Sequence, residues 1–268
     1  MAKTAILEDR GFIRVSGADA LPFLQGIVTN DVGRAEQGSA IYACLLTPQG
    51  QYLHDFFITR DADAFLLECA AASCADIIKR LTFYKLRSKV EIEDWQGRLF
   101  VHACFGGDGK GFPDPRHIGL GRRIYAVEKI PANASRQDYV DFCIDLGIPD
   151  SRAMRQGRDF LSALNLDQLN AVAWDKGCFV GQELTARIEY RGLAKKRLAI
   201  VTGSGLAEGE KLLEGEGQEA GEIRLVNASQ NKGLAVLKLA ALNGPLTAGT
   251  GGVAVQAALP GWLRVSGT

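Results

Sequence analysis

The sequence predicts an α+β protein that ends in a small β-rich domain. Over the first 93 residues, strand-like and helix-like segments follow in the order strand, helix, strand, strand, strand, helix, strand. That order favours an antiparallel or mixed sheet with helices on one face. After Arg191 the chain changes to short β-rich runs separated by glycine-rich turns, which are typical of a small barrel or sandwich. We therefore predict an α+β region over residues 1–191 and a β-rich domain over residues 192–268.

Hydrophobic periodicity predicts the first elements. Residues 11–15 alternate as a half-buried strand does. Ser16 and Asp19 resemble a capping box, so a helix is expected from residue 20 to about Thr29. An apolar run, a Pro-Gln-Gly turn and a run rich in β-formers then predict a hairpin. The hairpin and the elements after it are expected at strands 40–46 and 52–59, strand 65–69, helix 73–87 and strand 89–93.

The later part of the chain gives fewer signals. Residues 105–121 are rich in glycine and proline, and we expect a loop there. Ser135 is the expected N-cap of a helix that ends at Leu146, because Gly147 and Pro149 follow. The β-rich domain is expected to hold four short strands, at residues 196–202, 221–226, 233–239 and 252–255.

The composition excludes several classes of protein. Lys and Arg together number 31, as do Asp and Glu, so the formal net charge is zero. This balance argues weakly against non-specific binding to nucleic acid, and the 47% of hydrophobic residues is ordinary for a soluble globular protein. No apolar run approaches the roughly 18 residues of a membrane-spanning helix, so no membrane partner is expected. Glu8 and Asp9 interrupt the start of the chain, and no secretory signal is expected there.

The cysteines are too scattered for a disulfide framework. No Cys-x-x-Cys pair occurs and the three histidines lie far apart in the sequence, so we expect no metal site. A cytoplasmic protein with reduced thiols is therefore expected. The six cysteines are Cys44, Cys69, Cys74, Cys104, Cys143 and Cys178.

The most informative stretch of sequence surrounds Cys178. Gly177 and Gly181 flank this cysteine and would permit backbone conformations that a side chain forbids. Lys176, Arg187 and the start of an expected helix would place positive potential near the sulfur, which favours the reactive thiolate. The alternative is a buried structural cysteine, because free cysteines are among the most buried residues.

The octapeptide Lys-Gly-Cys-Phe-Val-Gly-Gln-Glu at residues 176–183 resembles the signature of the YgfZ family of folate-binding proteins. That family is related to the aminomethyltransferase, or T-protein, of the glycine cleavage system. Shorter stretches agree with the family in order and spacing, so the resemblance covers essentially the whole chain. These stretches are residues 15–31, 46–50, 84–90, 114–116 and 165–170.

The resemblance implies a folate-binding T-protein-like fold, with three lobes around a central channel and a small C-terminal β-barrel as the last lobe. The channel is expected to bind tetrahydrofolate. Members of the family act in the assembly or repair of iron–sulfur clusters, so iron–sulfur enzymes or assembly proteins are the expected partners. Some members affect tRNA thiomodification, which adds an expected link to tRNA. Cys178 is the residue that the family's function is expected to need.

The chemistry of folate indicates which side chains would contact it. A pterin presents an amide N–H beside an exocyclic amine, and one carboxylate accepts both hydrogen bonds. Glu183 and Asp55 are the carboxylate candidates, and Asp55 joins Cys178 as an expected catalytic residue. The anionic glutamate tail needs cations. The other expected folate contacts are Lys176, Gln182, Arg187, Arg87, Arg116 and Asn30. The alternatives are a helix cap for Glu183, solvated surface charges for the cations and a turn residue for Asn30.

The chain departs from the T-protein pattern at two positions. The pair His54-Asp55 stands where the T-protein hairpin carries paired aspartates, and Cys178 stands where an acid is usual. Both differences argue against aminomethyl transfer from a lipoyl carrier. Within the YgfZ group, Phe179 replaces the commoner tyrosine.

Three chemistries remain open for the Cys178 thiol: attack on a folate-bound one-carbon unit, transient ligation of iron, and redox chemistry. One cysteine does not hold a resident cluster, which normally needs about four protein ligands. The leading hypothesis is a tetrahydrofolate-binding accessory factor for iron–sulfur enzymes, and whether it turns over a substrate is open. The alternatives are a folate-dependent aminomethyl or methyl transferase, and a binding module that contacts tRNA through the basic run from Arg187 to Arg197.

Overall fold

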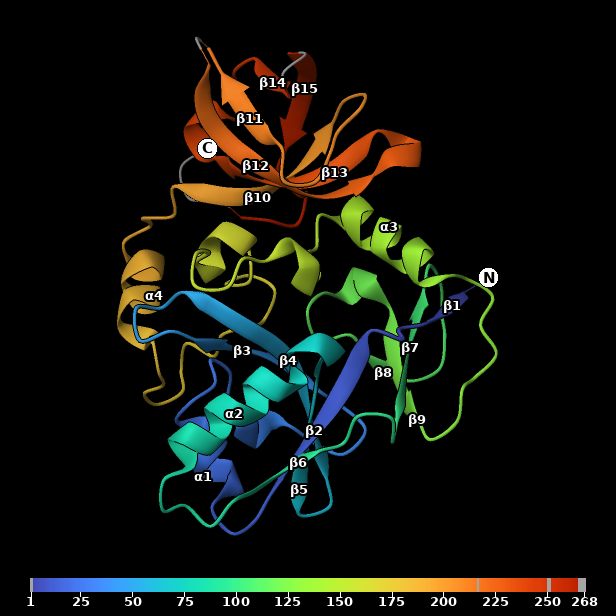
Figure 1. Cartoon of the computed structure of the whole chain (residues 1–268), viewed down its shortest axis with the longest axis vertical. Coiled ribbons are helices and arrows are strands. Elements are labelled where there is room, and N and C mark those ends of the chain that lie inside the picture. Colours follow the sequence, from blue (N-terminus) through green and yellow to red (C-terminus); the bar gives the residue numbers. More distant parts are fainter. Residues whose placement is uncertain (1, 216, 250–251, 265–268) are drawn as a thin grey trace. The chain divides into compact units, whose positions relative to one another are not determined.

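The computed structural model describes residues 2–215, 217–249 and 252–264, and the chain forms two compact units (Figure 1). Unit 1 comprises residues 1–139 and 169–182. Unit 2 comprises residues 140–168 and 183–268. These units do not divide the chain at residue 191. The predicted domains, an α+β region over residues 1–191 and a barrel over residues 192–268, therefore stay a prediction.

Unit 1 contains the antiparallel sheet that the first 93 residues predict. Its five strands lie in the order β3-β4-β5-β2-β6, and every pairing is antiparallel. The strands are β2 (Arg10–Ser16), β3 (Ile41–Leu46), β4 (Tyr52–Asp61), β5 (Ala64–Ala70) and β6 (Glu91–Asp94). The helices α1 (Ala20–Gln25) and α2 (Cys74–Lys85) share one core with alternate residues of these strands. Both helices therefore cover one face of the sheet, as predicted.

Helix α1 is shorter than the sequence predicts, and the capping box at its start does not form. The Asp19 side chain does not cap the helix, and its carboxylate instead accepts a hydrogen bond from the Lys89 backbone N–H at 2.7 Å. The helix ends at Gln25, because the residues after it turn to other partners. The Thr29 N–H donates to the Cys44 carbonyl of β3 at 3.0 Å. The predicted end at Thr29 was wrong, since pairing with β3 replaces the last helical turn.

A second sheet in unit 1 was not predicted. It has the order β1-β7-β9-β8 and is antiparallel throughout. Its strands are β1 (Lys3–Ile6), β7 (Phe100–Phe105), β8 (Phe112–Pro113) and β9 (Arg122–Ala126). The prediction of a loop over residues 105–121 was therefore wrong in part. Gly111 and Gly121 have positive φ, and a Cβ on either would lie 2.2 Å from a backbone oxygen. These glycines allow close approach of neighbouring backbone, which the sequence pattern does not distinguish from a surface turn.

Helix α3 (Arg136–Leu146) confirms the prediction made from Ser135. The Ser135 hydroxyl accepts from the Asp138 N–H at 3.1 Å, and the Asp138 carboxylate accepts from the Ser135 N–H at 2.7 Å. This is a reciprocal capping box with Asp at the third helical position. Gly147 follows the helix with φ of +71° and ends it, as predicted.

Unit 2 contains a closed β-barrel with the strand order β10-β13-β12-β11-β14-β15 (Figure 1). Its strands are β10 (Lys196–Thr202), β11 (Lys211–Glu214), β12 (Gln218–Asn227), β13 (Lys232–Lys238), β14 (Leu246–Ala248) and β15 (Val253–Ala258). All four predicted strands are present. The two that the sequence missed, β11 and β14, have four and three residues and are too short to show alternation. Across the described ranges, no helix is long and apolar enough to cross a membrane.

Candidate functional site

The signature segment is anchored to the residues that follow helix α1 in unit 1. The Thr29 hydroxyl donates to the Ala171 carbonyl at 2.6 Å, and the Ala173 N–H donates to the Thr29 carbonyl at 3.1 Å. The Asn30 side-chain amide donates to the carbonyls of Tyr42 at 2.7 Å and Asn170 at 2.8 Å. Both amide hydrogens of Asn30 are thus used inside the protein, where they fix the entry of the signature segment.

Lys176 makes a further anchor with three hydrogen bonds. Its ammonium donates to three backbone carbonyls, those of Gln25 at 2.8 Å, Val28 at 2.6 Å and Asn30 at 2.9 Å. These carbonyls lie at and beyond the end of α1, so the lysine satisfies groups that a short helix leaves unpaired. Burial lowers the pKa of Lys176 to about 8. In the structure this ammonium is bound by the chain's own carbonyls, and the predicted contact of Lys176 with folate stays a prediction.

The two glycines of the signature differ in what they do. Gly181 has φ of +82°, and a Cβ there would lie 2.5 Å from the Thr47 carbonyl oxygen and 2.9 Å from Cβ of Leu46. Gly177 has no such φ, and a Cβ there would meet nothing within 4 Å. The prediction that both glycines permit forbidden conformations is therefore confirmed for Gly181 and wrong for Gly177.

Cys178 is exposed, whereas the other five cysteines are buried. The alternative of a buried structural cysteine is therefore wrong. The next residue, Phe179, turns inward and is 8% exposed, and the Lys176 ammonium lies 5.3 Å from the centre of its ring. The Phe179 N–H donates to the Gln182 side-chain oxygen at 3.3 Å, at the start of α4 (Gln182–Tyr190). The loop is thus held by its inward-facing members and presents the sulfur to solvent.

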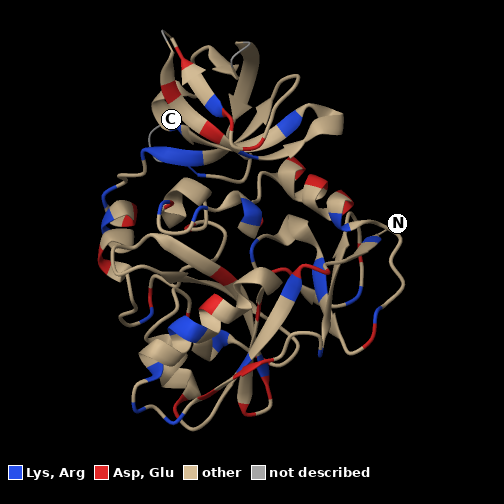
Figure 2. Ribbon diagram, in the orientation of Figure 1, with Lys and Arg blue, Asp and Glu red and all other residues tan. Residues whose placement is uncertain are grey.

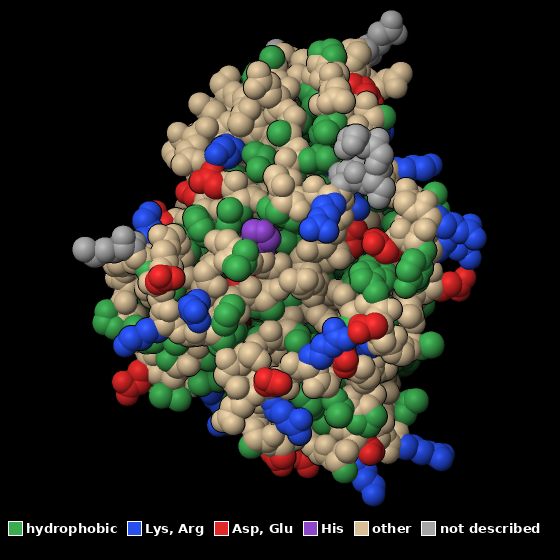
Figure 3. All heavy atoms as spheres, turned by 180° about the vertical axis from the view of Figure 1, so that it is seen from behind, with side chains coloured by type: hydrophobic (Ala, Val, Ile, Leu, Met, Phe, Trp, Pro, Cys, Tyr) green, Lys and Arg blue, Asp and Glu red, His purple; other side chains and the backbone are tan. Residues whose placement is uncertain are grey.

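The charged residues of α4 pair with each other. The Arg187 guanidinium donates to the Glu183 carboxylate at 3.1 Å, one helical turn away, and 89% of the Glu183 side chain is exposed. The predicted basic run does not form one exposed surface, because Arg197 is buried and donates to Asp167 at 2.7 Å. Figure 2 shows that residues of both charges are spread along the ribbon. On the face drawn in Figure 3, charges of both signs are interspersed.

The pair His54-Asp55 points to opposite faces of the first sheet. His54 lies on the helix-covered face and hydrogen-bonds Asp76 of α2 at 2.7 Å, and burial lowers its pKa despite that carboxylate. Asp55 lies on the other face, where its carboxylate accepts from the hydroxyls of Tyr42 at 3.0 Å and Tyr52 at 2.7 Å. Because successive side chains of a strand alternate, only Asp55 of this pair faces the side of the sheet away from the helices. We call the buried polar groups on that side the polar interior of unit 1.

Arg116 shares that interior with Asp55. Its guanidinium lies 5.8 Å from the centre of the Tyr42 ring, whose hydroxyl binds Asp55. It also donates to both oxygens of Asp114, at 3.0 and 2.8 Å. Although burial acts to raise it, the pKa of Asp114 is held at about 2 by the guanidiniums of Arg116 and Arg123. The structure therefore brings a predicted carboxylate and a predicted cation close to the same tyrosine.

Glu68 on β5 lies at the centre of this polar interior and was not predicted from the sequence. Its buried carboxylate accepts from Arg10 at 2.6 Å, from Arg123 at 3.0 and 2.5 Å, and from the Tyr125 hydroxyl at 2.8 Å. The sequence did contain a signal for this cluster. Glu68 stands in an otherwise apolar strand, and an acid in such a strand is rarely buried without partners. Arg87, the remaining predicted contact, is exposed just beyond α2.

The fold and the site define a T-protein-type protein with a closed C-terminal barrel. The GCVT N-terminal domain model matches residues 8–108, and the model of the CAF17 C-terminal beta-barrel domain matches residues 195–265. The aminomethyltransferase T of the glycine cleavage system from Bartonella henselae has the same fold, with a TM-score of 0.73 over 98% of this chain and 87% of that one. The two sequences are only 13% identical, so this match concerns the fold alone.

The mitochondrial iron–sulfur cluster assembly factor IBA57 is similar along almost the whole chain. The mouse protein is 33% identical and the human protein 31%, and each alignment covers 96% of this chain and 84% of the relative. This chain therefore belongs to the IBA57 family.

Proposed function

We propose that this chain is an accessory factor for the assembly or repair of iron–sulfur clusters, and that it binds tetrahydrofolate and acts through Cys178. Membership of a family of iron–sulfur cluster assembly factors supports the process. The observation that carries the proposal is the exposed Cys178 sulfur, at a turn that Lys176 and Gly181 fix from either side. A loop that is held by these contacts and presents one thiol is suited to reaction with a partner.

A single exposed cysteine limits the chemistry of the thiol. Since a cluster normally has about four protein ligands, Cys178 would supply one ligand while a partner protein supplies the others. Thiolate sulfur is a preferred ligand of iron–sulfur clusters, so brief ligation during transfer fits the chemistry. The partners we propose are iron–sulfur enzymes or their assembly proteins.

The folate part of the proposal depends on the polar interior of unit 1. Asp55 is a buried carboxylate that two tyrosine hydroxyls orient, and Arg116 lies close to one of these tyrosines. Such a carboxylate can accept the paired donors of a pterin edge. Glu183 and Arg187, which are exposed on α4, stay proposed folate contacts.

Replacing Cys178 by alanine is expected to abolish function without loss of stability. The side chain is exposed, so its removal leaves no cavity. In cells that lack this protein, Cys178→Ala should leave four-iron enzymes inactive, whereas Gly177→Ala should restore them because its added methyl group meets open space. Equal melting temperatures for the two variants would exclude misfolding. Full restoration by Cys178→Ala would contradict the proposed role of the thiol.

Replacing Asp55 by asparagine is expected to weaken tetrahydrofolate binding by about 10- to 100-fold, which is the loss of one charge-assisted pair. Asparagine keeps the shape and one acceptor oxygen, so it can replace the carboxylate toward one of the two tyrosine hydroxyls. Calorimetric titration of the full chain measures the change, with Asp63→Asn as the control, because 87% of the Asp63 side chain is exposed. No binding by the unmodified protein would contradict the folate part of the proposal, and tight binding by Asp55→Asn would contradict only the role of Asp55.

The resemblance to the YgfZ proteins adds two further parts to the proposal. One is a link to tRNA thiomodification through the iron–sulfur enzymes that perform it. The other is action in the cytoplasm with reduced thiols.

A further inference from the structure

Helix α2 ends with two large apolar side chains in solvent. Phe83 in its last turn is 76% exposed, and Leu86, the residue that follows the helix, is 87% exposed. Residues three apart on a helix are neighbours, so the two side chains leave unit 1 from adjacent points. The opposite face of the helix packs into the core of unit 1 through Cys74, Ile77 and Leu81. The end of α2 therefore presents a small apolar surface.

The fold does not account for these two side chains. The Phe83 ring meets the Tyr84 ring edge-on, with 5.7 Å between the ring centres, but most of Phe83 stays in solvent. Leu86 has φ of +46°, a value that bulky residues rarely adopt and that glycine adopts readily at the end of a helix. A glycine or a polar residue would suit both the backbone and the solvent better than leucine does. A contact outside the chain explains this leucine better than packing within unit 1.

The cations near these side chains outnumber the acids. Residues 77–90 contain five cations and no acid. Arg80 pairs with Asp76 at 2.6 Å, and the other four cations make no ion pair with any residue that the structure describes. These four are Lys79, Lys85, Arg87 and Lys89.

Two acids at the edges of this segment do not remove the excess of positive charge. The Asp19 carboxylate accepts from the Lys89 backbone N–H at 2.7 Å, and Glu91 is the next acid along the chain. When both are counted against the four unpaired cations, an excess of two positive charges remains. A helix C-terminus favours one cation in its last turn, which accounts for Lys85 but not for the others. Figure 2 shows the Lys and Arg residues along α2 and on the loop that follows it.

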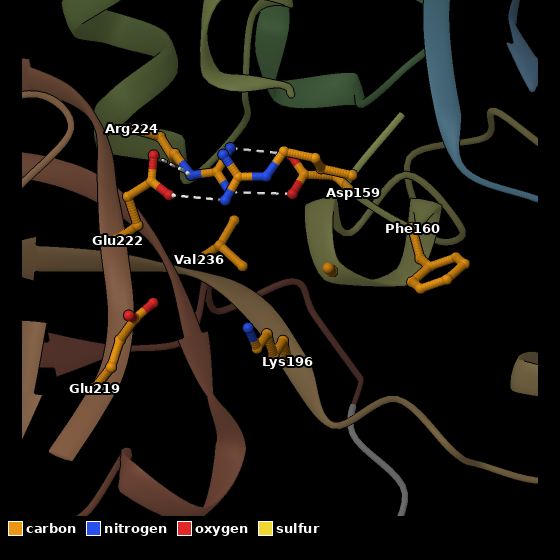
Figure 4. A pocket seen from close by; sticks show the side chains of 10 residues that line it. Asp159, Phe160, Lys196, Glu219, Glu222, Arg224 and Val236 are labelled. Atoms are coloured by element: carbon orange, nitrogen blue, oxygen red, sulfur yellow. Dashed lines mark hydrogen bonds and ion pairs between the residues drawn. The ribbon is translucent and has the colours of Figure 1, made fainter. Parts of the chain in front are cut away.

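The pocket of unit 2 has no such excess of charge. Its volume is about 230 Å³, and Figure 4 shows that its Arg224 pairs with Asp159, at 2.9 and 3.0 Å. The side chains that line it include three cations and three carboxylates, which are Arg158, Lys196, Arg224, Asp159, Glu219 and Glu222. Compensation of this kind is missing at the end of α2.

We propose that the end of α2 binds the surface of an anionic lipid bilayer. Phe83 and Leu86 would lie at the boundary between headgroups and acyl chains, where the apolar side chains of peripheral proteins are buried. The four unpaired cations would contact the anionic headgroups, because their long apolar stems let the charged ends stay at the headgroup level.

A bilayer fits this surface better than a folded protein partner does. The bilayer yields around side chains that protrude, whereas a protein would need a preformed acidic cavity of matching shape. Anionic headgroups also move laterally, so they can pair with cations on long flexible side chains. The expectation of no membrane partner followed from the lack of a membrane-spanning run, and binding at the bilayer surface needs no such run.

Sedimentation of the full chain with vesicles tests the proposal. The chain should sediment with vesicles of equal parts phosphatidylserine and phosphatidylcholine, and should stay in solution with vesicles of phosphatidylcholine alone. Phe83→Ser combined with Leu86→Gly should weaken binding by about tenfold or more, because the apolar area that enters the bilayer is lost. The matched control is Ile118→Ser combined with Val127→Ser, which removes side chains outside α2 that are 94% and 76% exposed. This control should change binding less than about twofold, since its residues are not expected to enter the bilayer. Leu86→Gly alone should not lower the melting temperature, because glycine accepts φ of +46°.

A second pair of variants tests the cations. Lys79→Gln combined with Lys85→Gln should weaken binding by about tenfold or more, since each cation near an anionic surface contributes about fivefold. Lys110→Gln combined with Lys195→Gln is the control, because both lysines are exposed and make no ion pair with a described residue. The proposal is overturned if the chain fails to sediment with the anionic vesicles, if neutral vesicles bind it equally well, or if either control weakens binding as much as its test variant. It is also overturned if the apolar surface holds a second copy of the chain, seen as a dimer that the apolar double variant dissociates.

Discussion

Replacing Glu68 by alanine is expected to destabilise unit 1 by about 3–5 kcal/mol, the usual cost of removing one partner from a buried ion pair. The Glu68 side chain is 0% exposed, and those of Arg10 and Arg123 are 9% and 2% exposed. Although burial acts to raise it, the pKa of Glu68 is held below its usual range by Arg123 and Arg10, so the carboxylate is charged at neutral pH. Without it, both guanidiniums stay buried while their shared counter-charge is lost.

Urea unfolding of the purified chain measures this loss. The matched control is Glu93→Ala, because Glu93 also pairs with an arginine of β2, Arg14 at 2.9 Å, but is 47% exposed. An exposed pair of this kind contributes about 0–1 kcal/mol, so the two variants should differ clearly. Equal losses would mean that the Glu68 cluster does not stabilise unit 1.

Burial and strand length explain why the sequence predicted one sheet of unit 1 and not the other. Strand β5 shows as an apolar run because one of its faces packs on the helices and the other is also buried. The second sheet has strands of four and two residues at β1 and β8, which are too short for a periodic signal. From the sequence alone, the charged residues of this sheet, such as Arg123, are expected at the surface, because only the fold brings Glu68 next to them.

The sequence predicts those parts of the site whose signal lies in neighbouring residues of the chain. Cys178 stands out between Gly177 and Gly181, and the structure shows Cys178 exposed and Gly181 at a positive φ. The role of Lys176 has no local signal, because its three carbonyl partners lie about 150 positions earlier in the chain. The tyrosines that orient Asp55 are also invisible in the sequence, since only the register of β3 and β4 brings Tyr42 toward it.

Replacing Gly181 by alanine is expected to be the most damaging small change in the signature segment. A residue other than glycine at φ of +82° costs about 1–3 kcal/mol in backbone strain. The new Cβ would also lie 2.5 Å from the Thr47 carbonyl oxygen, so the backbone of the turn between β3 and β4 or the signature loop must shift. We expect a total loss of about 3 kcal/mol, near the upper end of that range.

Gly177→Ala is the control for this change, since it adds the same methyl group four residues earlier, where nothing lies within 4 Å. Urea unfolding should separate the two variants by most of the predicted loss. The rate at which a thiol reagent modifies Cys178 should change in Gly181→Ala and stay the same in Gly177→Ala, because only the first moves the loop that carries the sulfur. If the two variants proved equally stable and reacted at equal rates, the position of Cys178 would not depend on the packing of Gly181 against residue 47. The display of the thiol would then have to depend on Lys176 and its three carbonyls alone.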